Sequence, residues 1–567
     1  MPTLPPGLIL RPADPTGTGP GRSVIATRSF SAGSTIAEFS DVGAHSTPTV
    51  AIPDSPRLSQ TCSYCLKPSA ALLNSLSASH GSGVPRGAVS QIHTCTGCRV
   101  SCYCGVACQR ADWKLVHGKG ECKAYKEGRV EAMKMGHPPE LPTPVRALLQ
   151  VLLRPDVRDA VFEMEGHEDA NRVAPGTRPF EMMLQVRLAV EWAGLELNEK
   201  NLSMGMDATC KLQVNSFNRR DEDFGQGGMY VNAALAMVNH SCIPNAYVAF
   251  TGRKAILHAY QDIKEGEEIT ISYTENDQPR SQRRHHLKTH YYFYCKCLRC
   301  QEDLDVYQVC KLYPNLELNS TDPYSLFRDV DKLRNPTAKY FLNSDKSLQK
   351  HLKEIYSACA GEIKISDNAG MRKEVNKRLK HCLQLLKAEL YAVEPLNTLF
   401  GLITLYFAKP NTLAYAFAIT CFQALYCDPY VSPAPFTATR VKGLFMIVKI
   451  LTMGPLSAKG KGNLATKLSQ ISSKVDQPTM CQMLLIAVIH YSPLAKSDEW
   501  QLRHQAQDLL DDLKSLKGRA KENALVDAFV KNPNGQEEQR FFNTVVREPI
   551  QEAAGFASEI LLTEFGD

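Results

Sequence analysis

The middle of the chain alternates apolar and polar residues with the period of two that half-buried strands show. Residues 248–259 have apolar side chains at alternate positions, and residues 269–271 repeat the pattern. Residues 262–266, Asp-Ile-Lys-Glu-Gly, have the composition of a turn between such runs. The pattern therefore predicts strands on both sides of this turn.

The N-terminal region is more broken. Residues 22–28 and 30–39 are short β-prone runs around an Ala-Gly turn, which predicts two strands. A glycine ahead of a strand lets a ligand approach the backbone closely. Residues 1–20 are rich in Pro, Gly and Thr, and we expect them to be mobile. Residues 40–60 have the polar, Pro-containing composition of a linker.

Beyond residue 302 the pattern changes to that of helices. Apolar residues over 375–393 recur at the i, i+4, i+7 spacing of one helix face. The segments 396–408, 411–427 and 438–452 continue in this style. Since no 34-residue period emerges, we predict a helical, repeat-like region without naming a repeat. Residues 123–235 alternate helical patterns, such as 182–192, with loops.

Composition places the chain among multi-domain soluble proteins. It has 567 residues, 44% of them hydrophobic and 22% charged. The net charge of +6 is too dilute over this length to argue for nucleic acid. No apolar run reaches the roughly 18 residues of a membrane helix, and the N-terminus lacks a basic signal region. The basic stretch Arg280–Lys288 is interpreted as a helix with a solvated face; contact with an acidic substrate or a phosphate backbone is the alternative.

The cysteines are distributed unevenly. Thirteen of the nineteen precede residue 301, mostly in C-x-C and C-x-x-C pairs. In a large chain without a secretory signal, such pairs indicate metal-binding thiolates in a reducing compartment. The other six are scattered among helical patterns and are interpreted as small core residues: Cys310, Cys359, Cys382, Cys421, Cys427 and Cys481.

A first cluster of metal-binding residue types lies between residues 62 and 122. Seven thiolates and one imidazole are the right number for two closed tetrahedral zinc sites: Cys62, Cys65, Cys95, Cys98, Cys104, Cys108, His117 and Cys122. His93 is an alternative to His117, and Cys102 is left over. Because so short a segment buries little apolar surface, metal binding must supply much of its folding free energy.

A second constellation lies at the centre of the chain. Asn239–Asn245 reads N-H-S-C-x-P-N, and residues 266–273 read G-E-E-I-x-I-x-Y. Cysteines of a C-x-C-x-x-C run follow at residues 295–300. Cys242 and the three thiols of this run can form an all-thiolate zinc site. Such a metal would close the segment after the strands over the loop of Asn239.

These three motifs, in this order, resemble the SET domain. The order C-x-x-C…C-x-x-C…Y-C-x-x-x-C-Q…W…H…C over residues 62–122 resembles a MYND zinc finger. Together they make residues 8–301 similar to the SET-and-MYND family of protein-lysine methyltransferases. The resemblance implies interleaved ligands, with one zinc on Cys62, Cys65, Cys104 and Cys108, a second on Cys95, Cys98, His117 and Cys122, and a third on Cys242, Cys295, Cys297 and Cys300.

The fold implied is α+β: a SET-domain β-fold split by the finger, a four-cysteine post-SET segment and an all-α C-terminal domain. The expected domains are the N-terminal part of the SET domain (8–48), the finger (58–125), a helical insert (126–228), the SET core (229–276), the post-SET segment (277–301) and the helical domain (302–567).

The resemblance also implies S-adenosylmethionine as methyl donor, a protein lysine as acceptor and three structural zinc ions. Residues 21–23 match the G-x-G donor loop, with Ser23 in place of its second glycine. The expected donor-binding residues are Gly21, Arg22, Ser23, Asn215, Asn239, His240, Tyr273 and Phe293, and the expected catalytic residues are Tyr273 and Tyr291, the latter lining the lysine channel.

The reaction implied is in-line methyl transfer to a neutral amine. Since a free lysine has a pKa of about 10.4, a dry aromatic channel is needed to disfavour its ammonium form. We expect a monomer in the cytoplasm or nucleus, with a protein substrate and without a membrane or nucleic-acid partner. The competing hypothesis is an interaction scaffold or transcriptional adaptor whose finger binds peptides while its SET fold is inactive.

Overall fold

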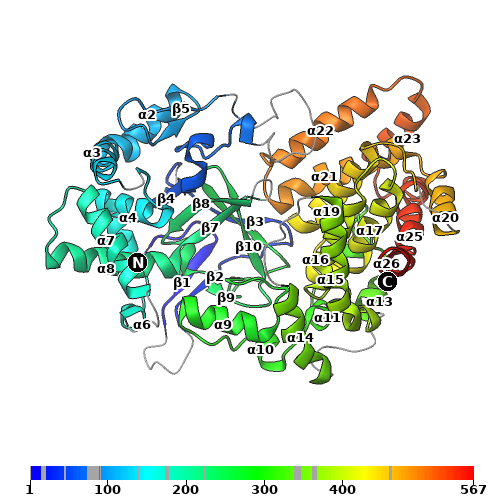
Figure 1. Cartoon of the computed structure of the whole chain (residues 1–567), viewed down its shortest axis with the longest axis horizontal. Coiled ribbons are helices and arrows are strands. Elements are labelled where there is room, and N and C mark those ends of the chain that lie inside the picture. The colour runs from blue at the N-terminus through cyan, green and yellow to red at the C-terminus, as the bar shows by residue number, and fades with distance from the viewer. Residues whose placement is uncertain are drawn as a thin grey trace. The chain divides into compact units, whose positions relative to one another are not determined.

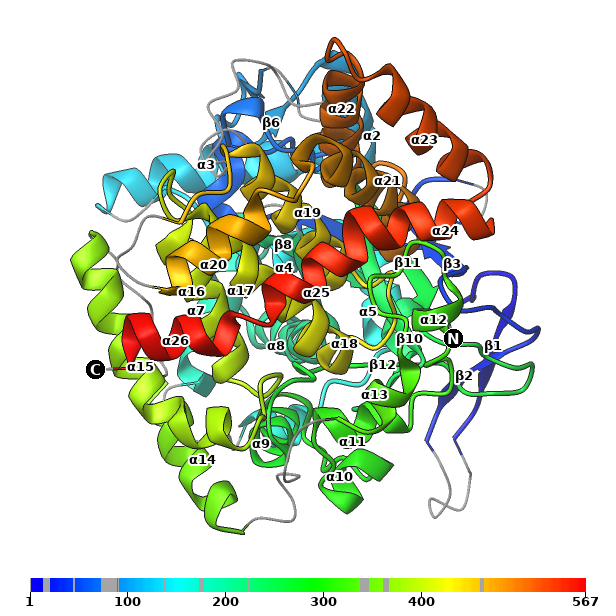
Figure 2. The ribbon, with the colours of Figure 1, turned by 90° about the vertical axis from the view of Figure 1, so that its right-hand side faces the viewer.

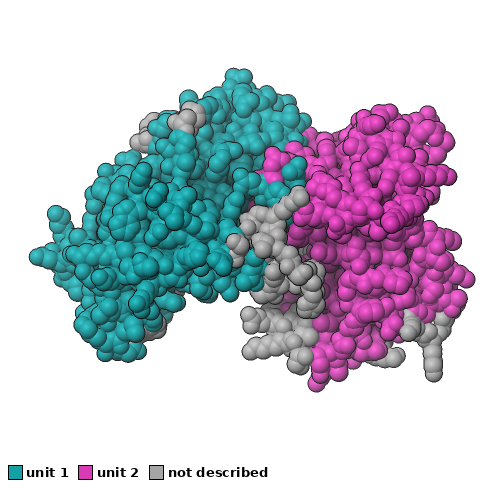
Figure 3. All heavy atoms as spheres, turned by 90° about the horizontal axis from the view of Figure 1, so that it is seen from above, with its two compact units in different colours: residues 1–273, 284–295, 499–504 teal, residues 274–283, 296–498, 505–567 magenta. Residues whose placement is uncertain are grey.

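The computed structural model describes residues 2–13, 21–43, 46–72, 89, 91–136, 139–172, 178–221, 225–336, 346–359, 367–458 and 463–566. It divides into two compact units, coloured separately in Figure 3. Unit 1 comprises residues 1–273, 284–295 and 499–504, and unit 2 comprises 274–283, 296–498 and 505–567. The predicted α+β class, with strands ahead of an all-helical region, is confirmed.

Unit 1 contains the strands, arranged in small sheets around the centre of the unit (Figure 1). The alternating residues 248–259 form strands as predicted, but they make two strands instead of one continuous run: β10 and β11 pair as an antiparallel hairpin, and β3 pairs with the far side of β11. The strands of unit 1 are β1 (Leu8–Arg11), β2 (Ser23–Ala26), β3 (Thr35–Phe39), β4 (Thr49–Pro53), β5 (His93–Thr94), β6 (Cys102–Tyr103), β7 (Phe217–Asp221), β8 (Gly225–Asn232), β9 (Asn239–His240), β10 (Ala246–Thr251), β11 (Lys254–Ala259) and β12 (Thr270–Ile271).

Two expectations for the N-terminal region are wrong. Residues 8–11 are not mobile, because β1 pairs with β2 from Leu8–Ala26 to Arg11–Ser23; residues 14–20 lie outside the described part of the chain. The expected linker over 40–60 contains β4, all of whose residues are buried. A strand covered on both faces lacks the alternation of apolar and polar residues, so the sequence Thr-Val-Ala-Ile was not recognised as a strand.

Strand β8 lies between β4 and β7, and one glycine permits its close approach to β4. Gly228 pairs with Pro53 at φ +145°, and a Cβ there would lie 1.9 Å from the carbonyl oxygen of Ile52. Only glycine fits this conformation and this space. The finger and the helical insert occupy the chain between these two paired strands.

The segment Asn239-His240 forms the short strand β9, which pairs in parallel with β12. The amide of Ser241 donates to the carbonyl of Ile271, which extends this pairing by one residue. Apolar residues of β2, β3, β10, β11 and β12 pack beneath it as one core. The pairing thus brings the N-H-S-C segment beside the start of the segment that ends in Tyr273.

The helices of unit 1 pack around a second core, which α4 crosses with almost every side chain buried. Gly128 of α3 allows a close contact, since a Cβ there would lie 2.2 Å from the ring of Trp192. The helical segments are η1 (Ser55–Gln60), α2 (Val106–Leu115), η2 (His117–Lys119), α3 (Glu121–Lys134), α4 (Thr143–Leu153), α5 (Pro155–Phe162), α6 (Glu168–Arg172), α7 (Arg178–Trp192), α8 (Glu199–Asn215) and η3 (Leu235–Met237).

The predicted basic helix is α9 (Arg280–Tyr291), whose residues belong first to unit 2 and then to unit 1. All further described elements lie after it and are helical: α10 (Leu298–Glu302), α11 (Val306–Lys311), α12 (Leu318–Thr321), α13 (Val330–Arg334), α14 (Lys346–Cys359), α15 (Asn368–Lys387), α16 (Leu396–Phe407), α17 (Leu413–Tyr426), α18 (Asp428–Val431), α19 (Ala438–Thr452), α20 (Asn463–Ser472), α21 (Gln477–Ala495), α22 (Gln501–Lys514), α23 (Ala520–Lys531), α24 (Gln536–Phe542), the π-helical turn η4 (Asn543–Arg547), α25 (Glu548–Ala554) and α26 (Ala557–Phe565).

The apolar helix α17 is the centre of unit 2, where it packs against α16, α19 and α25 (Figure 2). The helical pattern predicted over 375–393 extends beyond the helix that contains it. Helix α15 ends at Lys387, and Glu389 has a left-handed conformation with φ +60°. Helix α21 (Gln477–Ala495) is long and apolar enough to span a membrane by length and composition alone, but 72% of its apolar window is buried inside the fold. A core helix of a soluble protein has the same character.

Candidate active site and metal centres

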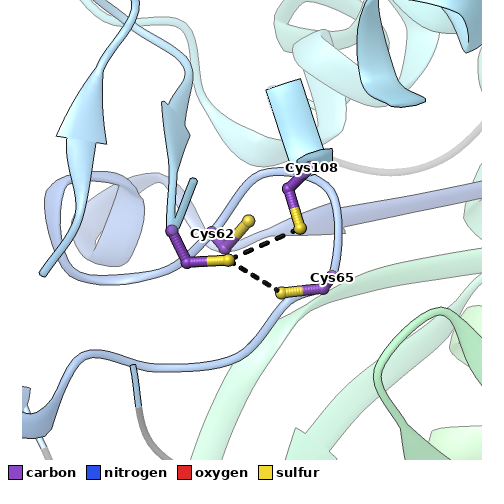
Figure 4. A group of neighbouring side chains, drawn as sticks. Cys62, Cys65 and Cys108 are labelled. Carbon is purple, nitrogen blue, oxygen red and sulfur yellow. Dashed lines mark hydrogen bonds between the residues drawn. The ribbon is translucent and has the colours of Figure 1, made fainter. Parts of the chain in front are cut away.

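The first metal group gathers Cys62, Cys65, Cys104 and Cys108, whose sulfur atoms all lie within 4.8 Å of one another. Figure 4 shows the thiols of Cys62, Cys65 and Cys108 turned toward one point. The Cys104 sulfur lies 3.4 Å from that of Cys108 and 3.7 Å from that of Cys65. Tetrahedral zinc with bonds of about 2.3 Å places its sulfurs about 3.8 Å apart. The hydrogen bond of the Cys65 thiol lowers the pKa of Cys62 to about 5, so a thiolate forms there readily.

The second metal group gathers Cys95, Cys98, His117 and Cys122. His117 Nε2 lies 3.4 Å from the Cys95 sulfur and 3.7 Å from the Cys98 sulfur. Gly97 makes room for the group, since a Cβ there would lie 3.0 Å from the Cys122 sulfur. These are the interleaved sets that the family resemblance implied.

The opposite nitrogen of the His117 ring faces a carboxylate that the sequence analysis missed. His117 Nδ1 lies 2.9 Å from Glu121 Oε2, and both side chains are buried. Burial opposes ionisation of Glu121, but its hydrogen bonds with His117 and Gln150 lower its pKa below the ordinary value. Asp112 also lies near this ring but accepts a 2.7 Å hydrogen bond from the Tyr103 hydroxyl. The only sequence signal for Glu121 was its place directly before Cys122.

The two residues left open beside the finger lie apart from both groups. His93 is exposed on β5, where it pairs with Tyr103 of β6. The buried Cys102 thiol donates to the Val100 carbonyl at 3.6 Å. Within the described residues, neither belongs to a cluster that could hold a metal ion.

The third metal group is Cys242, Cys295, Cys297 and Cys300, again with sulfurs within 4.8 Å of one another. The sulfurs of Cys242 and Cys295 are 3.9 Å apart. The Arg284 guanidinium donates to the Cys295 carbonyl at 3.3 Å. The C-x-C-x-x-C run thus lies beside the N-H-S-C segment, as its spacing led us to expect.

Tyr273 lies at the centre of an aromatic cluster. Its ring centroid is 4.8 Å from that of Tyr291 and 5.2 Å from that of His240, and the His240 ring lies 5.9 Å from that of Phe293. The Tyr273 hydroxyl donates to the Val238 carbonyl at 2.6 Å. Burial raises the pKa of Tyr273 well above 10, so the phenol is neutral at physiological pH. A neutral hydroxyl is thereby fixed against a backbone carbonyl in a largely apolar setting.

Both ring nitrogens of His240 are engaged within the protein. Nδ1 accepts from the Tyr273 amide at 2.9 Å, which leaves the proton of a neutral ring on Nε2. Nε2 lies 3.2 Å from the Cys242 sulfur. The imidazole therefore links Tyr273 to the third metal group.

Asn239 holds the segment expected to bind the donor. Its Nδ2 donates to the Arg22 carbonyl at 2.6 Å and to Glu268 Oε1 at 2.8 Å, which commits both amide hydrogens and leaves Oδ1 facing away from these partners. Glu268 is the second acid of the G-E-E run, a residue to which the sequence analysis gave no role. Ser23 is buried, and its hydroxyl accepts from Arg11 Nε at 3.1 Å.

Two other expected donor-binding positions differ in their surroundings. Gly21 is exposed, with open space where a Cβ would stand. Asn215 is the last residue of α8, and its Nδ2 donates to the carbonyls of Glu165 and Lys211. The Asn215 side chain is thus engaged by two carbonyls of the helical insert to which it belongs.

Residues 21–274 match the SET domain family. A protein named SET domain and MYND-type zinc finger protein 6, from Schizosaccharomyces pombe, is 29% identical over 262 residues, or 44% of this chain and 45% of that protein. This region of the chain is similar to SET domains, and its relatives include a protein of the SET-and-MYND type. The human histone-lysine N-methyltransferase SMYD3 is 29% identical over 217 residues, covering 36% of this chain and 48% of its own. Arabidopsis thaliana histone-lysine N-methyltransferase ASHR1 is 24% identical over 295 residues, covering 49% and 53%.

The chain thus spans about half the length of the curated relatives it matches. The SET domain match runs from Gly21 to the residue after Tyr273. It includes the cysteine-rich residues 62–122, which lie between strands β4 and β8. The C-x-C-x-x-C run and the helices of unit 2 follow it in the chain.

Proposed function

We propose that this SET-domain protein transfers a methyl group from S-adenosylmethionine to a lysine of another protein. The observation that carries the proposal is the setting of Tyr273, whose neutral hydroxyl lies 2.6 Å from a backbone carbonyl between the rings of Tyr291 and His240. The relatives named as lysine methyltransferases support it.

The residues expected to hold the donor suit its chemistry. Asn239 is fixed by two acceptors and keeps Oδ1 available for the donor's ammonium group. The open space beside Gly21 allows the donor to lie against the backbone. The Ser23 hydroxyl is already engaged by Arg11, so its side chain is accommodated within the sheet. The Phe293 ring offers a face for the adenine base.

When bound, S-adenosylmethionine supplies an electrophilic methyl group on a positively charged sulfur. The rings of Tyr273 and Tyr291 exclude water and disfavour a charged lysine, so the amine enters the channel neutral. The Tyr273 hydroxyl and the Val238 carbonyl then orient that amine toward the methyl group. The protein's contribution is alignment of two bound reactants in a dry site.

The test uses the full chain with isotopically labelled donor. Calorimetry should detect binding of unlabelled S-adenosylmethionine, and incubation with labelled donor and a cell lysate should label a protein on lysine, as mapped by mass spectrometry. A chain that binds donor but labels no protein in any lysate would contradict the proposed reaction. A chain that binds no donor would favour the interaction-scaffold hypothesis.

We further propose that each metal group holds one structural zinc ion. Sulfur separations of 3.4–3.9 Å in the described clusters suit tetrahedral zinc. All four ligands of each site come from the chain, so no position is left for catalysis by the metal. Elemental analysis should find three zinc ions per chain; two or fewer would refute one of the assignments.

Nineteen free thiols favour a reducing compartment, the cytoplasm or nucleus.

A further inference from the structure

The buried carboxylate of Glu121 lies behind the imidazole of the second metal group. His117 turns Nε2 toward the Cys95 and Cys98 sulfurs and Nδ1 toward Glu121 Oε2 at 2.9 Å. The exposed fractions of the two side chains are 0% and 4%. A carboxylate that accepts the Nδ1 proton fixes the tautomer whose Nε2 lone pair can bind a metal ion.

The other oxygen of this carboxylate faces helix α4. Glu121 Oε1 accepts from Gln150 Nε2 at 2.8 Å and from the Tyr125 hydroxyl at 3.3 Å. The same hydroxyl accepts from Arg146 Nε at 3.3 Å. Gln150 and Arg146 lie one turn apart on α4, so the finger is bonded to this helix through two adjacent positions.

The network continues into the SET sheet. Arg146 Nη1 donates at 2.9 Å to the carbonyl of Pro53, the last residue of β4. A row of hydrogen bonds therefore runs from a metal ligand of the finger, through Glu121 and α4, to a strand paired with β8. Each of its side chains is buried, so breaking one link leaves a polar group without solvent to replace its partner.

We propose that Glu121 is the positioning residue of the second metal site, and that it couples metal binding by the finger to the packing of α4 on strand β4. The inference rests on zinc being the occupant of this group. With the ion bound, the imidazole is held between metal and carboxylate, and Glu121 is held in turn against Gln150 and Tyr125. Loss of the ion frees the imidazole to turn and removes one of the constraints on Glu121.

The first test measures zinc retention in the full chain with Glu121→Ala, Glu121→Gln and, as the matched control, Glu127→Gln, which changes an exposed acid of the same helix. Zinc transfer to a chromogenic chelator is followed over time. We expect Glu121→Ala to release one zinc ion at least ten-fold faster than the wild type and the remaining ions at unchanged rates. Glu121→Gln keeps an acceptor for Nδ1 and should fall between the two, while Glu127→Gln should match the wild type.

The ions on the other groups serve as internal controls for folding. If Glu121→Ala released all its zinc together, the variant would be unfolded, and Glu121→Gln alone would decide: unchanged release of every ion would overturn the inference. Equal retention of zinc by Glu121→Ala and wild type would overturn it directly. If the wild type held no zinc on Cys95, Cys98, His117 and Cys122, the metal assignment itself would fail, which is a distinguishable result.

The second test measures the coupling by hydrogen exchange in the wild type. Limited chelation that removes the ion of the second group should speed amide exchange in residues 143–153 and 49–53, while the hairpin of β10 and β11 keeps its protection. Unchanged exchange in α4 and β4 after that ion has left would show that the finger's metal and the SET sheet are independent.

Discussion

The hydroxyl of Tyr273 is the group whose removal tests the proposed reaction most directly. Tyr273→Phe keeps the ring between Tyr291 and His240 and removes only the donor to the Val238 carbonyl. That carbonyl loses a buried partner, which costs about 1–3 kcal/mol of folding stability. Loss of one preorganised polar group in an active site lowers a rate by about 10²–10³-fold. We therefore expect methyl transfer to fall by about 10²-fold and donor affinity to stay within about two-fold.

The assay is single-turnover transfer of labelled methyl at saturating donor, with urea denaturation run on the same preparations. Tyr294→Phe is the control, because this substitution removes an equivalent hydroxyl from an exposed tyrosine. Burial raises the pKa of Tyr273, so its neutral form contributes stability fully below about pH 10, and that contribution is lost as the pH rises further. Transfer by Tyr273→Phe at the wild-type rate, in a folded chain, would refute the role given to the hydroxyl.

Three further substitutions test other parts of the structure. Glu268→Ala removes an acceptor of Asn239 Nδ2 and should weaken donor binding about ten-fold in calorimetry, whereas Glu267→Ala, in the exposed turn, should not; equal affinities would contradict the role of Glu268. Asp428 is buried in unit 2, and burial raises its pKa to about 7. Its neutral form therefore stabilises the fold fully below about pH 4, and this contribution falls as the pH rises toward 7. Asp428→Asn should flatten the pH dependence of the denaturation midpoint, and an unchanged slope would contradict this role of Asp428. Gly228→Ala places a Cβ 1.9 Å from the Ile52 carbonyl oxygen and should cost several kcal/mol, on the order of 3, in thermal unfolding; a wild-type midpoint would disprove the close approach.

The sequence predicted those parts of the site that depend on local spacing. Metal-binding residues such as Cys62 and Cys65 occur in closely spaced pairs, and alternation over 248–259 indicates strands, so both could be predicted from the sequence, although the turn that divides these residues into a hairpin was not. The roles of Glu121 and Glu268 could not be predicted in this way, because each depends on a partner that only folding brings near. That partner is Gln150 for Glu121 and Asn239 for Glu268.

The boundaries that failed have equally physical reasons. Strand β4 is buried on both faces, so its sequence shows no alternation of apolar and polar residues. Strand β1 is ordered by its pairing with β2, and no local sequence pattern predicts that pairing. In unit 2 the apolar residues Leu390 and Val393 remain in the core after α15 has ended, so apolar spacing alone extended the helix too far.

The pairing of β4 with β8 has a consequence for how this protein reaches its native state. Residues 54–224 separate the two strands, so their ladder can close only after a long loop has been brought together, which makes the contact slow to form. A nascent chain has the whole finger outside the ribosome before β8 is synthesised. Metal loading of the finger can thus precede completion of the sheet. Zinc starvation during synthesis should leave chains in which β4 is unpaired, exposed and prone to aggregation.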